Sequence, residues 1–127
     1  MKNILTAFIL FSLLLTVSAA EKTFMFGTES NPEKVEVSVK DGVYIVICTI
    51  KATGSGRVQA QMNELKAKKI CLLGIASYRK GEKVSRCSAT VRGMSLEKEP
   101  TKSGDSLVYV WQVPVDGFTE KTVRTEK

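Results

Sequence analysis

The dipeptide Asp41-Gly42 constrains this 127-residue chain more than any other feature. It stands between two apolar-rich runs, and Asp-Gly favours a two-residue hairpin turn because both residues tolerate the positive φ that the turn requires. A shift of one residue would move the valines of the first run to its charged face, so the alternation sets the register. The expected pairs are Lys40 with Val43, Val39 with Tyr44, Val37 with Val46 and Val35 with Cys48. The second run, residues 43–50, is apolar on both faces and predicts a central strand with cover on each side.

A helical pattern follows the glycine-rich break Gly54-Ser55-Gly56 and runs from about Arg57 to Leu73. At 100° per residue, bulky and small side chains fall in opposite stripes. The bulky stripe comprises Val58, Met62, Leu65, Leu72 and Leu73, and the small stripe comprises Ala60, Ala67, Cys71 and Gly74. We expect the small stripe to lie close against the sheet and the bulky stripe to meet other parts of the core. The alternative is a helix that ends near Lys69, with residues 70–78 partly a strand.

Two later runs alternate in the same way and predict strands over residues 84–92 and 107–113. Tyr109 and Trp111 share one face of the last strand. Large aromatic side chains more often fill a core, so we expect both inside; the alternative is an exposed ligand platform. Residues 93–106 are expected to form a flexible loop.

Together these segments predict an α+β fold. The expected order is β-β-α-β-β, an antiparallel sheet of about four strands with one helix packed on a face. Phe24 and Phe26 mark a candidate leading strand. After Asp116-Gly117 the chain is polar and is expected to fray.

The beginning of the chain has the pattern of an export signal. Lys2 supplies a positive charge, an apolar run of 14 residues follows from Ile4, and Ser18-Ala19-Ala20 provides small residues for cleavage. The run is shorter than the roughly 20 residues of a spanning helix, so cleavage is favoured over a retained anchor. We expect a signal peptide over residues 1–20, a single domain over residues 21–127, and a periplasmic or secreted protein.

Composition argues against most catalytic sites. The chain has no histidine, so it lacks the base of Ser-His-Asp and Cys-His sites and the ligand of most zinc centres. The carboxylates are scattered, and their spacing places no pair across a cleft. We therefore expect a non-catalytic domain that uses neither a cofactor nor a metal.

Three cysteines in an exported chain allow one disulfide. We favour Cys71 with Cys87, since closing that loop of 15 intervening residues would stabilise the fold by about 3 kcal/mol in the chain-entropy model. The alternative is three buried free thiols that pack as small apolar side chains.

Residues 66–92 are the most basic part of the chain, with eight cationic residues and one acidic residue, Glu82. The candidate anion-binding residues are Lys66, Lys69, Arg79, Lys80, Lys83, Arg86 and Arg92. Such a surface attracts an acidic glycan, a lipid head group or nucleic acid. Nucleic acid is disfavoured because only Tyr78 is near to stack on a base. The competing and commoner interpretation is a solvated basic face.

One stretch carries a resemblance. Gln61-Met62-Asn63-Glu64-Leu65-Lys66-Ala67-Lys68-Lys69, running into Leu72-Leu73-Gly74 behind an export signal and an Asp-Gly hairpin, resembles small exported bacterial α+β proteins of unassigned function over about 40 residues. The resemblance implies an envelope or extracellular setting and supplies no site residues.

Three hypotheses for function follow. The first is an exported binding or assembly domain whose partner is another envelope or extracellular protein, held by a strand added to a sheet edge. The second is a cationic binder of an anionic glycan, lipid head group or nucleic acid through residues 66–92. The third is a small inhibitor or immunity-type protein that presents residues 93–106 to an exported enzyme.

Overall fold

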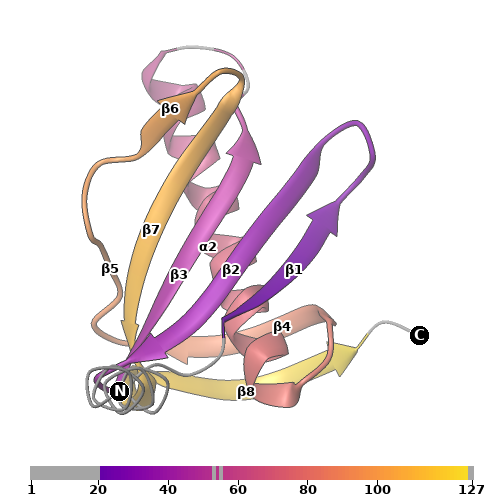
Figure 1. Cartoon of the computed structure of the whole chain (residues 1–127), viewed down its shortest axis with the longest axis vertical. Coiled ribbons are helices and arrows are strands. Elements are labelled where there is room, and N and C mark those ends of the chain that lie inside the picture. Colours follow the sequence, from indigo (N-terminus) through magenta and orange to yellow (C-terminus); the bar gives the residue numbers. More distant parts are fainter. Residues whose placement is uncertain (1–20, 53, 55, 126–127) are drawn as a thin grey trace, which may run out of the picture.

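The computed structural model describes residues 21–52, 54 and 56–125. The expected signal peptide, residues 1–20, lies outside the described residues, as do residues 53 and 55 of the glycine-rich break. In the described part, one α-helix packs on one face of an antiparallel sheet (Figure 1). The α+β fold class is therefore confirmed.

The elements follow in the order β1 (Lys22–Gly27), β2 (Pro32–Lys40), β3 (Val43–Lys51), α2 (Arg57–Lys80), β4 (Val84–Val91), β5 (Ser95–Leu96), β6 (Thr101–Ser103), β7 (Ser106–Pro114), the short 3-10 helix η1 (Val115–Gly117) and β8 (Phe118–Thr125). The main sheet has the order β1-β2-β3-β7, and β5 and β6 both pair with the outer edge of β7. Strands β4 and β8 form a separate two-stranded ribbon. The prediction of about four strands was wrong in number, and β4 does not join the main sheet.

The β2–β3 hairpin is confirmed in its turn, its register and its faces. Asp41 and Gly42 have φ of 53° and 76°, and all four expected pairs form. On one side of the hairpin Val35 and Val37 are fully buried under α2, and Val39 near the turn is half-buried. On the other side no described element covers β3, where Ile45 is half-buried, so the expected cover on both faces was wrong.

Helix α2 continues to Lys80, seven residues beyond the expected end. It ends at Gly81, whose φ of 83° gives the left-handed cap that glycine favours, and the Gly81 N–H donates to the Ser77 carbonyl at 2.8 Å. Gly74 does not end the helix. It is where the helix lies closest to the sheet, because a Cβ there would collide with the Val35 side chain. The alternative of a strand over residues 70–78 was wrong.

The two stripes of α2 differ in how far they are buried. Of the small stripe, Ala67, Cys71 and Gly74 lie on the sheet as expected, whereas Ala60 near the start of the helix is exposed. The bulky stripe meets other core only in the second half of the helix, where β4 covers it. In the first half Val58 and Met62 are exposed, as is Leu65, so that part of the expectation was wrong.

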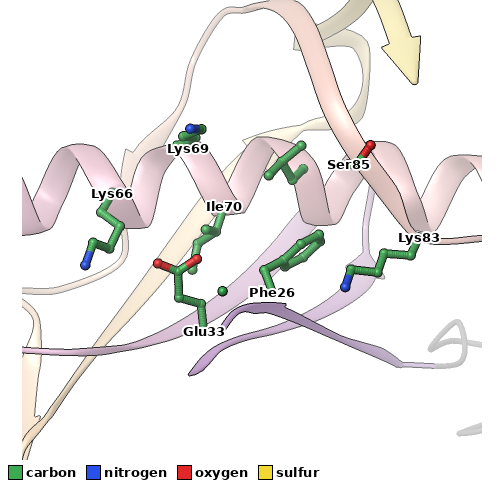
Figure 2. A pocket seen from close by; sticks show the side chains of 9 residues that line it. Phe26, Glu33, Lys66, Lys69, Ile70, Lys83 and Ser85 are labelled. Atoms are coloured by element: carbon green, nitrogen blue, oxygen red, sulfur yellow. The ribbon is translucent and has the colours of Figure 1, made fainter. Parts of the chain in front are cut away.

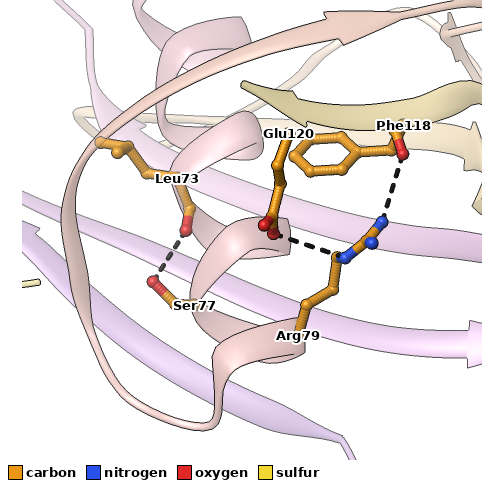
Figure 3. Close-up of polar contacts among 5 residues, drawn as sticks. All are labelled: Leu73, Ser77, Arg79, Phe118 and Glu120. Carbon is orange, nitrogen blue, oxygen red and sulfur yellow. Dashed lines mark hydrogen bonds and ion pairs between the residues drawn. The ribbon is translucent and has the colours of Figure 1, made fainter. Parts of the chain in front are cut away.

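The β4–β8 ribbon is attached to the C-terminal end of α2 by the contacts of Figure 3. The Arg79 guanidinium donates from Nη1 to the Phe118 carbonyl at 3.2 Å and lies 3.4 Å from the Glu120 carboxylate. The buried Ser77 hydroxyl donates to the Leu73 carbonyl at 2.7 Å and accepts from the Val84 N–H at 2.8 Å. Because β8 is held in this way, the expectation of a frayed tail after Gly117 was wrong.

Two further expectations concern the aromatic pair on β7 and the segment before it. Tyr109 and Trp111 are buried in the core, as predicted. Within residues 93–106, the expected loop, β5 and β6 run along β7.

All three cysteines are free, so the expected disulfide between Cys71 and Cys87 does not form. Cys71 lies beside Cys48 between helix and sheet, whereas Cys87 lies on the ribbon. Burial raises the pKa of the Cys48 thiol far above its usual value, and the neighbouring Cys71 thiol adds to that rise.

Candidate anion-binding site

A cavity of about 420 Å³ opens where α2 passes β1 and the start of β4 (Figure 2). Its size falls in the range of small-ligand sites. The lining residues are Phe26 and Gly27 of β1, Glu33 of β2, Lys66, Lys69, Ile70 and Leu73 of α2, Lys83, and Ser85 of β4.

Three of the lining residues are lysines, and two local features bring them together. Lys66 and Lys69 stand three positions apart on α2, a spacing that puts both side chains on the same side of a helix. Lys83 follows the Gly81 cap, where the chain turns from α2 into β4. Its Nζ lies 5.3 Å from the centre of the Phe26 ring, within the range of a cation–π contact.

The floor of the cavity is apolar. Phe26, Ile70 and Leu73 are all buried and belong to the hydrophobic core. Glu33, which is half-buried, is the only carboxylate among the lining residues. Three ammonium groups and one carboxylate leave the lining with a formal charge of +2 above an apolar base. An anionic group attached to an apolar body matches this arrangement.

The structure separates the other candidate cations from this cavity. Arg79 points to the ribbon, where its guanidinium also lies 5.3 Å from the centre of the Phe118 ring. Arg86 lines a second hollow of about 300 Å³ on the ribbon together with Arg124, its cross-strand partner. Lys80 and Arg92 are exposed and line neither cavity. The candidate cations of the basic segment therefore do not form one continuous site.

Sequence reasoning missed the residues that the first two strands contribute. Phe26 was assigned only to a candidate leading strand, and Glu33 was assigned to no site. No local signal in the sequence placed Phe26 beside Lys66 and Lys69. The pairing of β1 with β2, in which Phe26 lies opposite Glu33, brings both to the cavity.

In the described part of the chain, no group of three or more His, Cys, Asp or Glu residues could hold a metal ion. Over the same residues, no helix has the length and apolar character needed to cross a membrane. Comparisons with protein-family models, with curated proteins and with solved structures found no match to this chain.

Proposed function

We propose that the protein is an exported, non-catalytic domain that binds an anionic ligand in the cavity beside α2. The observation that supports this function is that Lys66, Lys69 and Lys83 line one cavity together with the buried apolar residues Phe26, Ile70 and Leu73. The ligand carries a phosphate or carboxylate on a body with an apolar part, such as the acyl chains behind a lipid head group or the C–H face of an acidic sugar. Export is part of the proposal on the sequence pattern of residues 1–20.

The geometry favours a ligand over a merely solvated basic face. Here two lysines share one side of a helix turn, and the third lies over an aromatic ring on the opposite wall. Buried Ile70 and Leu73 lie between them, where the local dielectric is lower and attraction for an anion is stronger than in open water.

The test is a titration of the 21–127 protein followed by NMR or calorimetry. The probes are inorganic phosphate, a short-chain phosphatidic acid below its micelle concentration, and glucuronate. We expect binding of at least one of the two organic probes, with phosphate alone weaker because it leaves the apolar floor uncovered. The double variant Lys66→Ala/Lys69→Ala should lose affinity at least about tenfold, as expected when charge-assisted contacts are removed.

The matched control is Lys80→Ala/Arg92→Ala, which removes the same charge from exposed positions outside the cavity. It should change the affinity less than about twofold, because screening weakens charges at a distance. Equal losses in both double variants would reduce the effect to net charge and contradict the proposal. If none of the three probes binds, the proposal is also contradicted.

A second candidate, a protein partner that adds a strand, is favoured by the free edge of β1. One edge of Lys22–Gly27 pairs with β2, and no described strand pairs with the other. Unpaired edges are templates for strand addition. The third hypothesis, an inhibitor that presents residues 93–106, has less support because β5 and β6 hold that segment along β7.

Strand addition is tested by amide hydrogen exchange on protein mixed with envelope extract and re-isolated with its partner. The β1 amides that face away from β2 should become protected, and capture should survive Lys66→Ala/Lys69→Ala and high salt. Protection that is unchanged in β1, or capture that is lost in salt, would contradict strand addition.

A further inference from the structure

The outer face of the first half of α2 is an apolar ridge formed by Val58, Met62 and Leu65. Their exposed fractions are 66 %, 56 % and 65 %, and the spacing of four and then three residues places them on one side of the helix. Further along α2 the outer face is covered by the β4–β8 ribbon, which lies at the C-terminal end of the helix in Figure 1. Of the described residues, none covers the ridge.

Cations stand on both sides of this ridge. Lys66 lies on the side of the cavity, Lys69 continues the line of the crest one turn beyond Leu65, and helical spacing puts Arg57 and Lys68 on the side of β7. Glu64 is the single acidic residue between Arg57 and Lys69, so this part of the helix has a formal charge of +3. The ridge is thus apolar along its crest and positive along its flanks.

We propose that the first half of α2 docks in the plane of an anionic lipid bilayer. A helix of this kind places its apolar side chains at the boundary between head groups and acyl chains, while its lysines reach the anionic head groups with their long stems. Charge complementarity selects this occupant. A second copy of the chain would bring the same four cations against these four, and like charges repel.

The shape of the ridge also fits a bilayer better than a protein partner. The crest is a convex row of flexible aliphatic side chains, without the aromatic or buried arginine anchors that carry most protein interfaces. A bilayer adapts to a convex row, whereas a protein needs a groove of matching shape. The apolar crest lies outside the cavity, although Lys66 and Lys69 belong to both surfaces, and the inference does not rest on the ligand proposed there.

The test is flotation of the 21–127 protein with vesicles of phosphatidylcholine alone and with equimolar phosphatidylglycerol. We expect binding to the mixed vesicles only, weaker at high salt. Met62→Gln/Leu65→Gln should lower the partition coefficient at least about tenfold, since it removes most of the apolar crest. Arg57→Gln and Lys68→Gln should each lower it about fivefold, the effect of one cation near an anionic surface.

The matched control is Met25→Gln, which replaces an exposed apolar side chain on β1, away from the ridge, and should leave the partition coefficient unchanged. Circular dichroism checks that each variant is folded, and soluble-ligand titration checks that the cavity still works. Binding of the ridge variant equal to that of the unchanged protein would overturn the inference, as would no binding to mixed vesicles. A lipid-free dimer that Met62→Gln/Leu65→Gln abolishes would also overturn it and assign the ridge to a second copy.

Discussion

The two halves of α2 bury the same inner face and differ in what covers the outer one. In the second half, Ala76 is fully buried under the ribbon, and Ser77 and Arg79 hold that ribbon in place. In the first half, the outer side chains Met62 and Leu65 are mostly exposed. The ribbon holds the covered half to the rest of the fold. The bare half and the adjacent lysines are where we propose that binding takes place.

The strongest way to break this comparison is to remove an aromatic ring from the ribbon that covers the second half of α2. Phe118 is buried and packs edge-on against Tyr44, with ring centres 6.4 Å apart. We expect Phe118→Ala to lower the free energy of unfolding by about 3–5 kcal/mol, measured by urea denaturation, because it leaves a cavity under the ribbon. Met62→Ala on the bare half should change it by less than about 0.5 kcal/mol. Similar losses in the two variants would show that the halves do not differ.

A buried hydroxyl sharpens the comparison further. Ser77→Ala removes the acceptor of the Val84 N–H and leaves that donor buried without a partner. The free energy of unfolding should fall by about 1–3 kcal/mol. Ser85→Ala is the matched control, because the Ser85 hydroxyl donates a hydrogen bond to the Arg124 carbonyl at 3.2 Å where both are exposed to solvent. If the two substitutions cost the same, burial is not what distinguishes these serines.

The thiols under α2 predict a dependence on pH. Because the pKa of Cys48 is raised in the folded state, the unfolded chain loses this proton first as the pH rises. The stability that the protonated Cys48 thiol contributes is complete below the usual thiol pKa. Above about pH 8.5 it is lost, and the free energy of unfolding falls by about 1.4 kcal/mol per pH unit. Denaturation of the unchanged protein and of Cys48→Ala, each at neutral and alkaline pH, measures it. The variant should show the shallower decline, and parallel declines would contradict the assignment to Cys48.

The smallest expected effect concerns the pair of Arg79 and Glu120. Both side chains are about one-third exposed, at 37 % and 32 %, so solvent screens their attraction. A double-mutant cycle with Arg79→Ala and Glu120→Ala should give a coupling free energy of about 0.5 kcal/mol that decreases with salt. A coupling above about 2 kcal/mol would mean that the pair is far less screened than its exposure indicates.

Local chemistry made the hairpin and the helix predictable. Asp41 and Gly42 accept the positive φ of the turn, and the period of two then determines which side of β2 and β3 is buried. The small stripe on α2 was likewise sufficient to identify the face that lies on the sheet. The end of the helix was missed, because Gly74 in a close helix–sheet contact has the same appearance in sequence as a terminal glycine.

The ribbon and the cavity were not predictable by the same means. An alternating strand has the same pattern whichever strand it pairs with, so nothing in residues 84–92 indicated that Val91 would pair with Phe118. The cavity needs Phe26 and Lys66 side by side, although 39 residues separate them in the sequence. Only two of its three lysines are close neighbours in sequence.

The sequence by itself determined the α+β class, the register of the β2–β3 hairpin and the inner face of α2, since turn chemistry and side-chain periodicity act over a few residues. Only the tertiary structure decided which half of α2 the ribbon covers, and so which apolar side chains stay exposed. It also decided which lysines line the cavity with Phe26. The physical reason is that burial depends on contacts between segments distant in the chain, and the periodicity of one segment carries no information about its partner.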